Sequence, residues 1–193
     1  VSPIWDTGLA SHALLETGAA EALNRVAKGL QWLEPKQVLD VRGDWIARRP
    51  HVRPGGWAFQ YANPHYPDVD DTAVVALAMD RARSMDARID HRPAIERAQE
   101  WILGLQSKNG AWGAFDADNE YHYLNHIPFA DHGALLDPPT EDVTARCVSM
   151  LAQLGEKPEN SPAVSAAVDY LKGTQLADGS WYGRWGMNYI YGT

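Results

Sequence analysis

The sequence predicts an all-helical protein whose helices pair into hairpins that are wound into a barrel or a solenoid. Apolar residues recur with helical spacing in every regularly patterned segment, and no convincing alternating strand is present. A motif made of an aromatic–aliphatic pair, a Gln and a Gly-x-Trp occurs three times, ending at Trp45, Trp112 and Trp181. Because two helices fit into each interval of about 70 residues, a helical hairpin is the expected repeating unit.

Each copy of the motif is predicted to be the end of a helix followed by a turn. Three stretches with helical apolar spacing, 23–33, 95–105 and 164–171, each lead into the Gln of a motif. Ser161 and Pro162 mark the start of the third helix, since Ser is a favoured N-cap and Pro fits the first helical position. The glycine is expected to adopt a turn conformation, the Gln to bond backbone groups at the helix end, and the Trp to pack over the turn.

Further helices are predicted between the copies of the motif. They lie at about residues 7–17, 71–85 and 140–154. The first is expected to end at Gly18 and the last at Gly155. The stretch 113–139 is rich in Gly, Pro, Asn and Asp, and a loop of this length is usually functional or disordered.

Composition excludes several classes of protein. The formal net charge of -8 argues against a nucleic-acid surface, which needs clustered Lys and Arg. Cys147 is the only cysteine, so the chain has neither an internal disulfide nor a Cys-based zinc cluster. No apolar run of about 18 residues and no secretory signal are present. The abrupt ends, at Val1 and Thr193, are interpreted as those of an internal piece of a longer protein.

Three aspartates meet at the start of the predicted helix 71–85. Asp68, Asp70 and Asp71 follow Pro67, which disfavours helix upstream, and they precede an apolar run. One of them would suffice as a helix cap, and capping is the simplest interpretation of each aspartate alone. Crowded carboxylates cannot all ionise cheaply, so one tends to keep its proton, and the helix N-terminus favours the anion once the proton leaves. The cluster therefore predicts an acid that is protonated at neutral pH and donates strongly.

Two other interpretations of the acidic residues remain open. The aspartates can bind a divalent metal and a diphosphate, although no Lys and Arg cluster adjoins them. Farther along the chain, Asp142 and Arg146 are four residues apart and share a helix face. Arg146 either forms a surface ion pair of little value or donates to an aspartate of the cluster, which stabilises that anion.

Many aromatic residues sit in loops beside glycine. Aromatic faces stabilise cations without reacting as nucleophiles, which a carbocation reaction requires. Packing is the simpler role, especially for the tryptophans of the repeated motif, and stacking on sugars is a third. The loop aromatics are Trp57, Phe59, Phe115, Phe129, Trp185, Tyr189 and Tyr191.

These segments together resemble the squalene–hopene cyclases, and the resemblance covers essentially the whole chain. It is carried by GGWAFQYANPHYPDVDDTAVV at 55–75, NHIPFADHG at 125–133, DPPTEDVTA at 137–145 and GRWGMNYIYGT at 183–193, together with the repeats. The resemblance implies an (α/α) barrel of inner and outer helices in a two-barrel enzyme. Residues 1–193 are then expected to form the central portion of the enzyme, mostly one barrel that carries the acid motif.

The resemblance also implies a reaction. Asp70 would protonate a terminal double bond of squalene, with Asp68 and Asp71 supporting it, and the cation cascade would end in hopene or hopanol. No cofactor or metal is implied. Matching motifs place Asp137 and Asp142 in the hydrogen-bonding region behind the acid. Residues expected to line or shape the cavity are Trp5, Phe59, Phe115, Phe129, Trp185 and Tyr191.

The implied partners are squalene and a membrane. Members of the family are monotopic membrane enzymes, so peripheral attachment on the cytoplasmic side is expected through parts outside this chain, and a homodimer is allowed; nucleic acid is not expected. Arg146 stands where some members have His, and arginine cannot relay a proton by titrating. Reprotonation of Asp70 through ordered water is therefore hypothesised. His132 stands where some members carry Phe.

Three other classes of function remain as alternatives. An inverting glycoside hydrolase on an (α/α) barrel would also use paired carboxylates and aromatic stacking, but with more polar partners among its aromatics. A class II diterpene cyclase shares the D-x-D-D motif and would need basic residues for a diphosphate. A helical-repeat binding module would leave the three aspartates and the stretch 113–139 without a purpose.

Overall fold

A computed structural model describes residues 2–128, 136–184 and 188–193. In these ranges the chain forms helices, and its only β-type pairings are two isolated bridges. The α-helices are α1 (Pro3–Glu16), α2 (Ala20–Leu33), α3 (Val69–Met85), α4 (Arg92–Gly104), α5 (Glu141–Gln153), α6 (Pro162–Thr174) and α7 (Tyr189–Gly192). The 3-10 helices are η1 (Glu34–Lys36), η2 (Asp44–Ala47) and η3 (His122–His126). The described helices confirm the predicted ones with small shifts of their ends.

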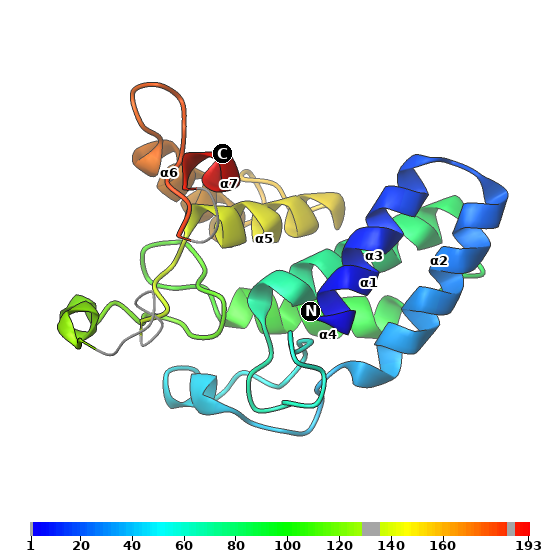
Figure 1. The fold of residues 1–193 in the computed structure, drawn as a ribbon, viewed down its shortest axis with the longest axis horizontal. Helices are drawn as coiled ribbons and strands as arrows, with labels where there is room; N and C mark the ends of the chain where they lie inside the picture. Colours follow the sequence, from blue (N-terminus) through cyan, green and yellow to red (C-terminus); the bar gives the residue numbers. More distant parts are fainter. Residues whose placement is uncertain (1, 129–135, 185–187) are drawn as a thin grey trace.

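The helices alternate between an inner and an outer row. In the inner row α3 packs against both α1 and α5, and in the outer row α2, α4 and α6 pack against α1, α3 and α5 in turn (Figure 1). Helix α3 is buried over most of its surface and is rich in alanine, which lets its neighbours approach closely. The apolar core lies between the rows and includes the perpendicular pair Trp45 and Trp101. This arrangement is one arc of an (α/α) barrel.

Local signals set the helix ends. Gly18 has φ +65 just after α1 and Gly155 has φ +95 just after α5, a region that only glycine enters readily. Ser161 occupies the N-cap position of α6 as expected, with Pro162 following it, but its side chain makes no capping hydrogen bond. None of the described helices is both long and apolar enough to cross a bilayer.

The tryptophan of the repeated motif packs over the turn as predicted, but the predicted register of the first copy is wrong. The indole N–H groups of Trp57, Trp112 and Trp181 each donate to a carbonyl at the end of the preceding helix, whereas the indole nitrogen of Trp45 is buried without a partner. The acceptors are Leu33 (2.8 Å), Ile102 (2.7 Å) and Leu171 (2.8 Å). A long segment that contains η2 separates Gln37 from Trp57, so the spacing of the other copies points to the nearer Trp45 instead.

The motif glutamines connect successive outer helices. Gln37 donates to the carbonyl of Ala94 at 2.9 Å, and Gln106 donates to that of Ala163 at 2.8 Å. These bonds tie the end of α2 to the first turn of α4, and the end of α4 to the first turn of α6. A close backbone approach fixes the glycine in both of these copies: a Cβ on Gly55 would meet the carbonyl of Arg97, and one on Gly110 would meet that of Ala166. Gly110 also has φ +88.

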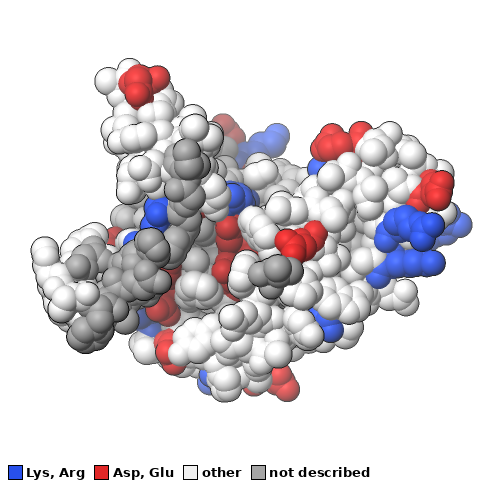
Figure 2. Space-filling view, viewed as in Figure 1, with Lys and Arg blue, Asp and Glu red and all other residues white. Residues whose placement is uncertain are grey.

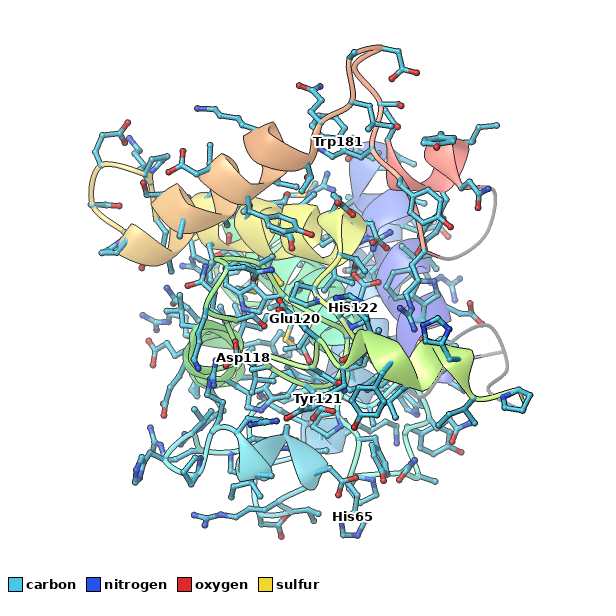
Figure 3. All side chains as sticks on the ribbon, turned by 90° about the vertical axis from the view of Figure 1, so that its left-hand side faces the viewer. His65, Asp118, Glu120, Tyr121, His122 and Trp181 are labelled. Carbon is cyan, nitrogen blue, oxygen red and sulfur yellow. The ribbon has the colours of Figure 1, made fainter. Side chains whose placement is uncertain are left out.

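The loop that follows α4 is held by ionic contacts. Asp118 accepts from the backbone N–H of Lys108 at 2.7 Å and pairs with Arg49 at 3.0 Å. The guanidinium of Arg48 stacks on the ring of Tyr121 at 5.3 Å. In Figure 3, Asp118 and Tyr121 are near the middle of the view, below Trp181 and above His65. The described part of the stretch 113–139 is therefore an anchored loop that contains η3.

Candidate active site

Helix α3 begins inside the aspartate cluster, and the three carboxylates have different tasks there. Asp68 is the N-cap, and one of its oxygens accepts the backbone N–H groups of Asp70 at 2.7 Å and Asp71 at 3.3 Å. The capping role that any one aspartate could fill thus belongs to Asp68. Asp70 and Asp71 lie in the first helical turn, where the helix dipole stabilises an anion.

The aspartates border a cavity of about 500 Å³. Its lining residues are Trp5, Phe59, Asp68, Asp70, Asp71, Ala114, Phe115, Asp142, Val143 and Tyr191. Figure 2 shows acidic side chains in the central hollow of the molecule, beside basic ones. The cavity walls come from α1, α3, α5, α7 and two loops, and apart from the acids they are mainly aromatic and apolar. Four of the six predicted cavity residues are brought together here, and Phe129 and Trp185 lie outside the described residues.

Arg146 of α5 is the partner of Asp70. Its Nη1 lies 2.9 Å from each oxygen of the Asp70 carboxylate and 3.5 Å from Asp142. The side chain of Asp70 is 15% exposed and that of Arg146 28%, so this pair is shielded from water. The predicted contact between Arg146 and the cluster is present, and the alternative of an exposed surface pair is wrong. Neither oxygen of the buried Asp142 has a hydrogen-bond partner.

Burial raises the pKa of all three carboxyl groups. For Asp70, burial raises the pKa to about 6, with Arg146 opposing the shift and Asp142 adding to it. For Asp71, burial and then the charges of Asp70 and Asp6 raise the pKa to about 7. Burial and the two neighbouring aspartates raise the pKa of Asp68 well above its usual range, against the N–H groups that it accepts.

That Asp70 is protonated at neutral pH stays a prediction. Burial raises its pKa to about 6 even though the adjacent guanidinium of Arg146 favours the anion. Asp68 and Asp71, which lie beside it, also have raised pKa values. The cluster therefore favours keeping a proton near neutral pH.

Asp137, which the resemblance places in the hydrogen-bonding region behind the acid, is linked to the acid helix through the loop 114–116. Its carboxylate accepts three consecutive backbone N–H groups of the loop 114–116, at 3.0, 2.6 and 2.8 Å. The carbonyl of Ala114 in that loop accepts the N–H of Val69, the first residue of α3, at 2.7 Å. Asp137 therefore orders the loop that presents Phe115 to the cavity and contacts the start of the acid helix.

We expect Asp137→Ala to destabilise the fold by about 2–4 kcal/mol, because a charged acceptor of three buried N–H groups is lost. Thermal unfolding of the full-length protein checks this. Asp137→Asn keeps one oxygen acceptor and should give a smaller loss. An alanine variant with an unchanged unfolding midpoint would show that the loop 114–116 is held by other contacts.

Asp6 was missed at the sequence level. It lies in the first turn of α1, and its charge is one of the causes of the raised pKa of Asp71. No local signal marks it, since an acidic residue in a first helical turn is ordinary. It reaches the cluster only because α1 packs against α3. His132, where the resemblance departs from some family members, lies outside the described residues.

Comparisons with solved structures show the fold. The type II terpene cyclase MstE from Scytonema aligns over 98% of this chain and 46% of its own, with a TM-score of 0.65 and 17% sequence identity. At this identity the likeness concerns the fold alone. Together with the helices described above, it confirms the predicted all-α architecture, a part of an (α/α) barrel of inner and outer helices.

Comparisons of sequence show the family. Squalene–hopene cyclase of Zymomonas mobilis is 63% identical over 194 residues, and a probable squalene–hopene cyclase of Sinorhizobium fredii is 62% identical over 193. Squalene–hopene cyclase of Alicyclobacillus acidocaldarius is 48% identical over 193 residues. All three cover 100% of this chain, which spans 29–30% of their lengths.

A family profile described as the squalene-hopene cyclase C-terminal domain matches residues 1–193. The place of residues 1–193 as the central portion of a longer enzyme stays a prediction. The match of the whole chain, and its identity to curated relatives, agree with the acid motif, the repeats and the fold. The chain belongs to the squalene–hopene cyclase family.

Proposed function

We propose that the protein containing this chain cyclises squalene to hopene and hopanol, and that Asp70 is the acid that starts the reaction. One observation carries the proposal: the carboxyl group of Asp70 borders an aromatic-walled cavity, with a helix N-terminus beneath it and an arginine beside it. The relatives, which are squalene–hopene cyclases, support the substrate and the products.

The proposed reaction begins when protonated Asp70 gives its proton to a terminal double bond of squalene. The resulting tertiary cation is attacked by the next double bond, and successive ring closures carry the charge along the folded chain. The cascade ends when a proton leaves, giving hopene, or when water adds and then loses a proton, giving hopanol. Arg146 and the N-terminus of α3 stabilise the Asp70 anion that remains.

The cavity walls fit a carbocation better than they fit the alternatives. Phe59 and Phe115 offer ring faces that stabilise positive charge, and we assign the same role to Phe129 and Trp185. Among the described lining residues no Asn, Gln, Ser or Thr side chain is present, so the polar partners of a sugar would be the aspartates and Tyr191, all close to the acid helix. No Lys or Arg is among them either, which disfavours a diphosphate substrate.

Asp70 must regain a proton after each turnover. The pKa of Arg146 is raised above its usual value by Asp70, Tyr191 and Asp142 despite burial, so this residue stays charged throughout. We therefore keep ordered water as the proposed route of the proton. Asp68 and Asp71 would support the acid as neighbouring carboxylates with raised pKa values.

The location and assembly of the protein are further proposals. An apolar C30 substrate dissolves in membrane lipid, which supports peripheral attachment to the cytoplasmic face of the cell membrane through parts outside this chain. A homodimer is compatible with that arrangement. Sedimentation of the full-length protein with lipid vesicles tests the attachment, and a protein that stays in the supernatant would contradict it.

Turnover in heavy water tests the proposed reaction. With the full-length protein and squalene in D₂O, hopene should contain one carbon-bound deuterium, because the acid donates a solvent-exchanged proton to carbon once per turnover. Mass spectrometry of the pentacyclic product measures this. Product without deuterium would exclude an exchangeable acid as the initiator, and unchanged squalene would exclude the proposed activity.

The pH dependence of kcat/KM should report the acid. Since Asp70 must be protonated to act, and its pKa is raised to about 6, kcat/KM should fall by about tenfold per pH unit above that value. Steady-state assays of the full-length protein between pH 5 and 8 measure this limb. A rate that rises over the same range would mean that a base, not an acid, limits the reaction.

A further inference from the structure

Arg146 is enclosed by two aromatic rings as well as by its carboxylate partners. The centre of its guanidinium lies 5.4 Å from the ring of Trp5 and 5.8 Å from the ring of Tyr191, both within the range of cation–π contact. Trp5 belongs to α1, Arg146 to α5 and Tyr191 to α7, so three separate elements meet at this cation.

The rings supply a restraint that the ion pair lacks. Only one guanidinium nitrogen, Nη1, contacts the Asp70 carboxylate, and it is shared by both oxygens at 2.9 Å. Such a contact does not fix the plane of the guanidinium as a two-nitrogen fork would. Arginine also loses considerable rotamer freedom when it is held in one place. Flat rings next to the guanidinium reduce the orientations that it can adopt.

We propose that Trp5 and Tyr191 are positioning residues that hold the guanidinium of Arg146 and thereby keep it in contact with the carboxyl group of Asp70. This inference rests on the proposed function, in which Asp70 is the acid. In this proposal the partner of the two rings is a permanent cation of the protein, the guanidinium of Arg146. Phe59 and Phe115 line the same cavity without a contact to a protein cation among the described residues, so the two pairs of aromatics have separate roles.

The surroundings of Asp70 make Arg146 decisive. The titratable or charged groups that face the cluster are Asp68 and Asp71 from α3, Asp142, Arg146 and Cys147 from α5, Asp6 from α1, and Tyr191 from α7. In this described set Arg146 is the single cation, and the remaining groups are neutral or negative. Any loosening of Arg146 therefore makes ionisation of Asp70 harder.

The test is the pH profile of ring-deletion variants in the full-length protein. In Trp5→Leu and Tyr191→Leu the alkaline limb of kcat/KM should move to higher pH by about one unit, the lower end of the effect of an adjacent arginine. The maximal rate at low pH should fall, because the acid becomes weaker. Trp5→Phe keeps a ring and should restore most of the wild-type profile. Tyr191→Phe should restore only part of it, because it keeps the ring but loses the hydroxyl group that also bonds Arg146.

Phe59→Leu is the matched control, since it removes a ring from the same cavity without touching Arg146. It should lower the rate and leave the position of the alkaline limb unchanged. If the Trp5 and Tyr191 variants behave like this control, with slower turnover and an unmoved limb, the proposed positioning role is wrong. Failure of the proposed function would give a different result: Asp70→Asn would turn over squalene at the normal rate, so Asp70 would not be the acid.

Discussion

Asp70→Asn is expected to abolish squalene turnover in the full-length protein, with a loss of at least about 10²–10⁴-fold. The amide has the shape of the carboxyl group but cannot deliver a proton to a carbon–carbon double bond. Asp68 is committed to the cap of α3 through two backbone N–H groups, so it is badly placed to take over. Product formation from squalene, measured by gas chromatography, gives the size of the loss.

The variant should remain folded. Asparagine removes a buried charge whose burial raises its pKa, and this removal favours the folded state. Arg146 loses its main partner but keeps Asp142 at 3.5 Å. We therefore expect a helical circular dichroism spectrum like that of the wild type. This separates loss of the acid from loss of the structure.

Asp80→Asn is the matched control for this experiment. Asp80 lies on the same helix α3 and is also buried, but it pairs with Arg83 and does not line the cavity. The control should retain turnover as long as it folds. Normal turnover by Asp70→Asn would mean that another carboxyl group of the cluster is the acid. If Asp71→Asn alone lost turnover, that acid would be Asp71.

The acid helix could be predicted from sequence because its determinants are local. Pro67 blocks a helix upstream, Asp68 caps the next turn, and an apolar run follows at once. The glycines that end α1 and α5 are equally local, since their φ values need no distant partner. The family resemblance added the inner and outer rows, which no local pattern encodes.

Features that depend on tertiary packing were harder to predict. Arg146 is 76 residues from Asp70, and the two side chains meet only because α3 and α5 pack together. The prediction that Trp45 is the Trp of the first copy of the motif is wrong for a different reason. The longer segment before Trp57 breaks the spacing. The hydrogen bonds of the Trp57 indole to Leu33 and of Gln37 to Gly55 identify the motif residues of this copy.

The sequence predicts that the pKa values of the clustered carboxyl groups are raised, but it does not predict their order or their main cause. Crowding of three aspartates predicts raised pKa values, and burial proves to be the larger cause for each of them. Sequence cannot rank the three, because the ranking depends on which carboxylate faces Arg146 and which faces Asp6. Both partners come from other helices.

The cluster should also cost the protein stability at neutral and alkaline pH, and Asp71→Asn should recover part of it. Asp71 is 1% exposed, and one of its oxygens has no hydrogen-bond partner. Its pKa rises from 3.8 to about 7 on folding, mainly through burial and then through the charges of Asp70 and Asp6. A shift of about three pKa units sets an upper bound of about 4 kcal/mol on the cost of ionising it in the folded state.

The sign of the pH dependence follows from proton binding. Below about pH 4 Asp71 is protonated in both the folded and the unfolded chain, so its charge costs nothing. Between about pH 4 and pH 7 the folded protein holds a proton that the unfolded chain has released, and the free energy of unfolding falls as pH rises. Above pH 7 Asp71 is ionised in both the folded and the unfolded chain, and the full free-energy cost of its buried charge is present. Asp71→Asn removes this dependence, so its advantage over the wild type should grow through this window.

Thermal unfolding of the full-length protein at pH 5 and pH 8 measures this difference. The unfolding midpoint of Asp71→Asn should exceed that of the wild type at pH 8 by several degrees more than at pH 5. Asp86→Asn is the control, because Asp86 pairs with Arg88, which lowers its pKa to about 2, and its removal should give no gain at pH 8. A gain for Asp71→Asn that is equal at both pH values would come from packing rather than charge. A gain confined to pH 8, together with reduced turnover, would mean that this protein keeps a destabilising carboxylate because its chemistry needs one.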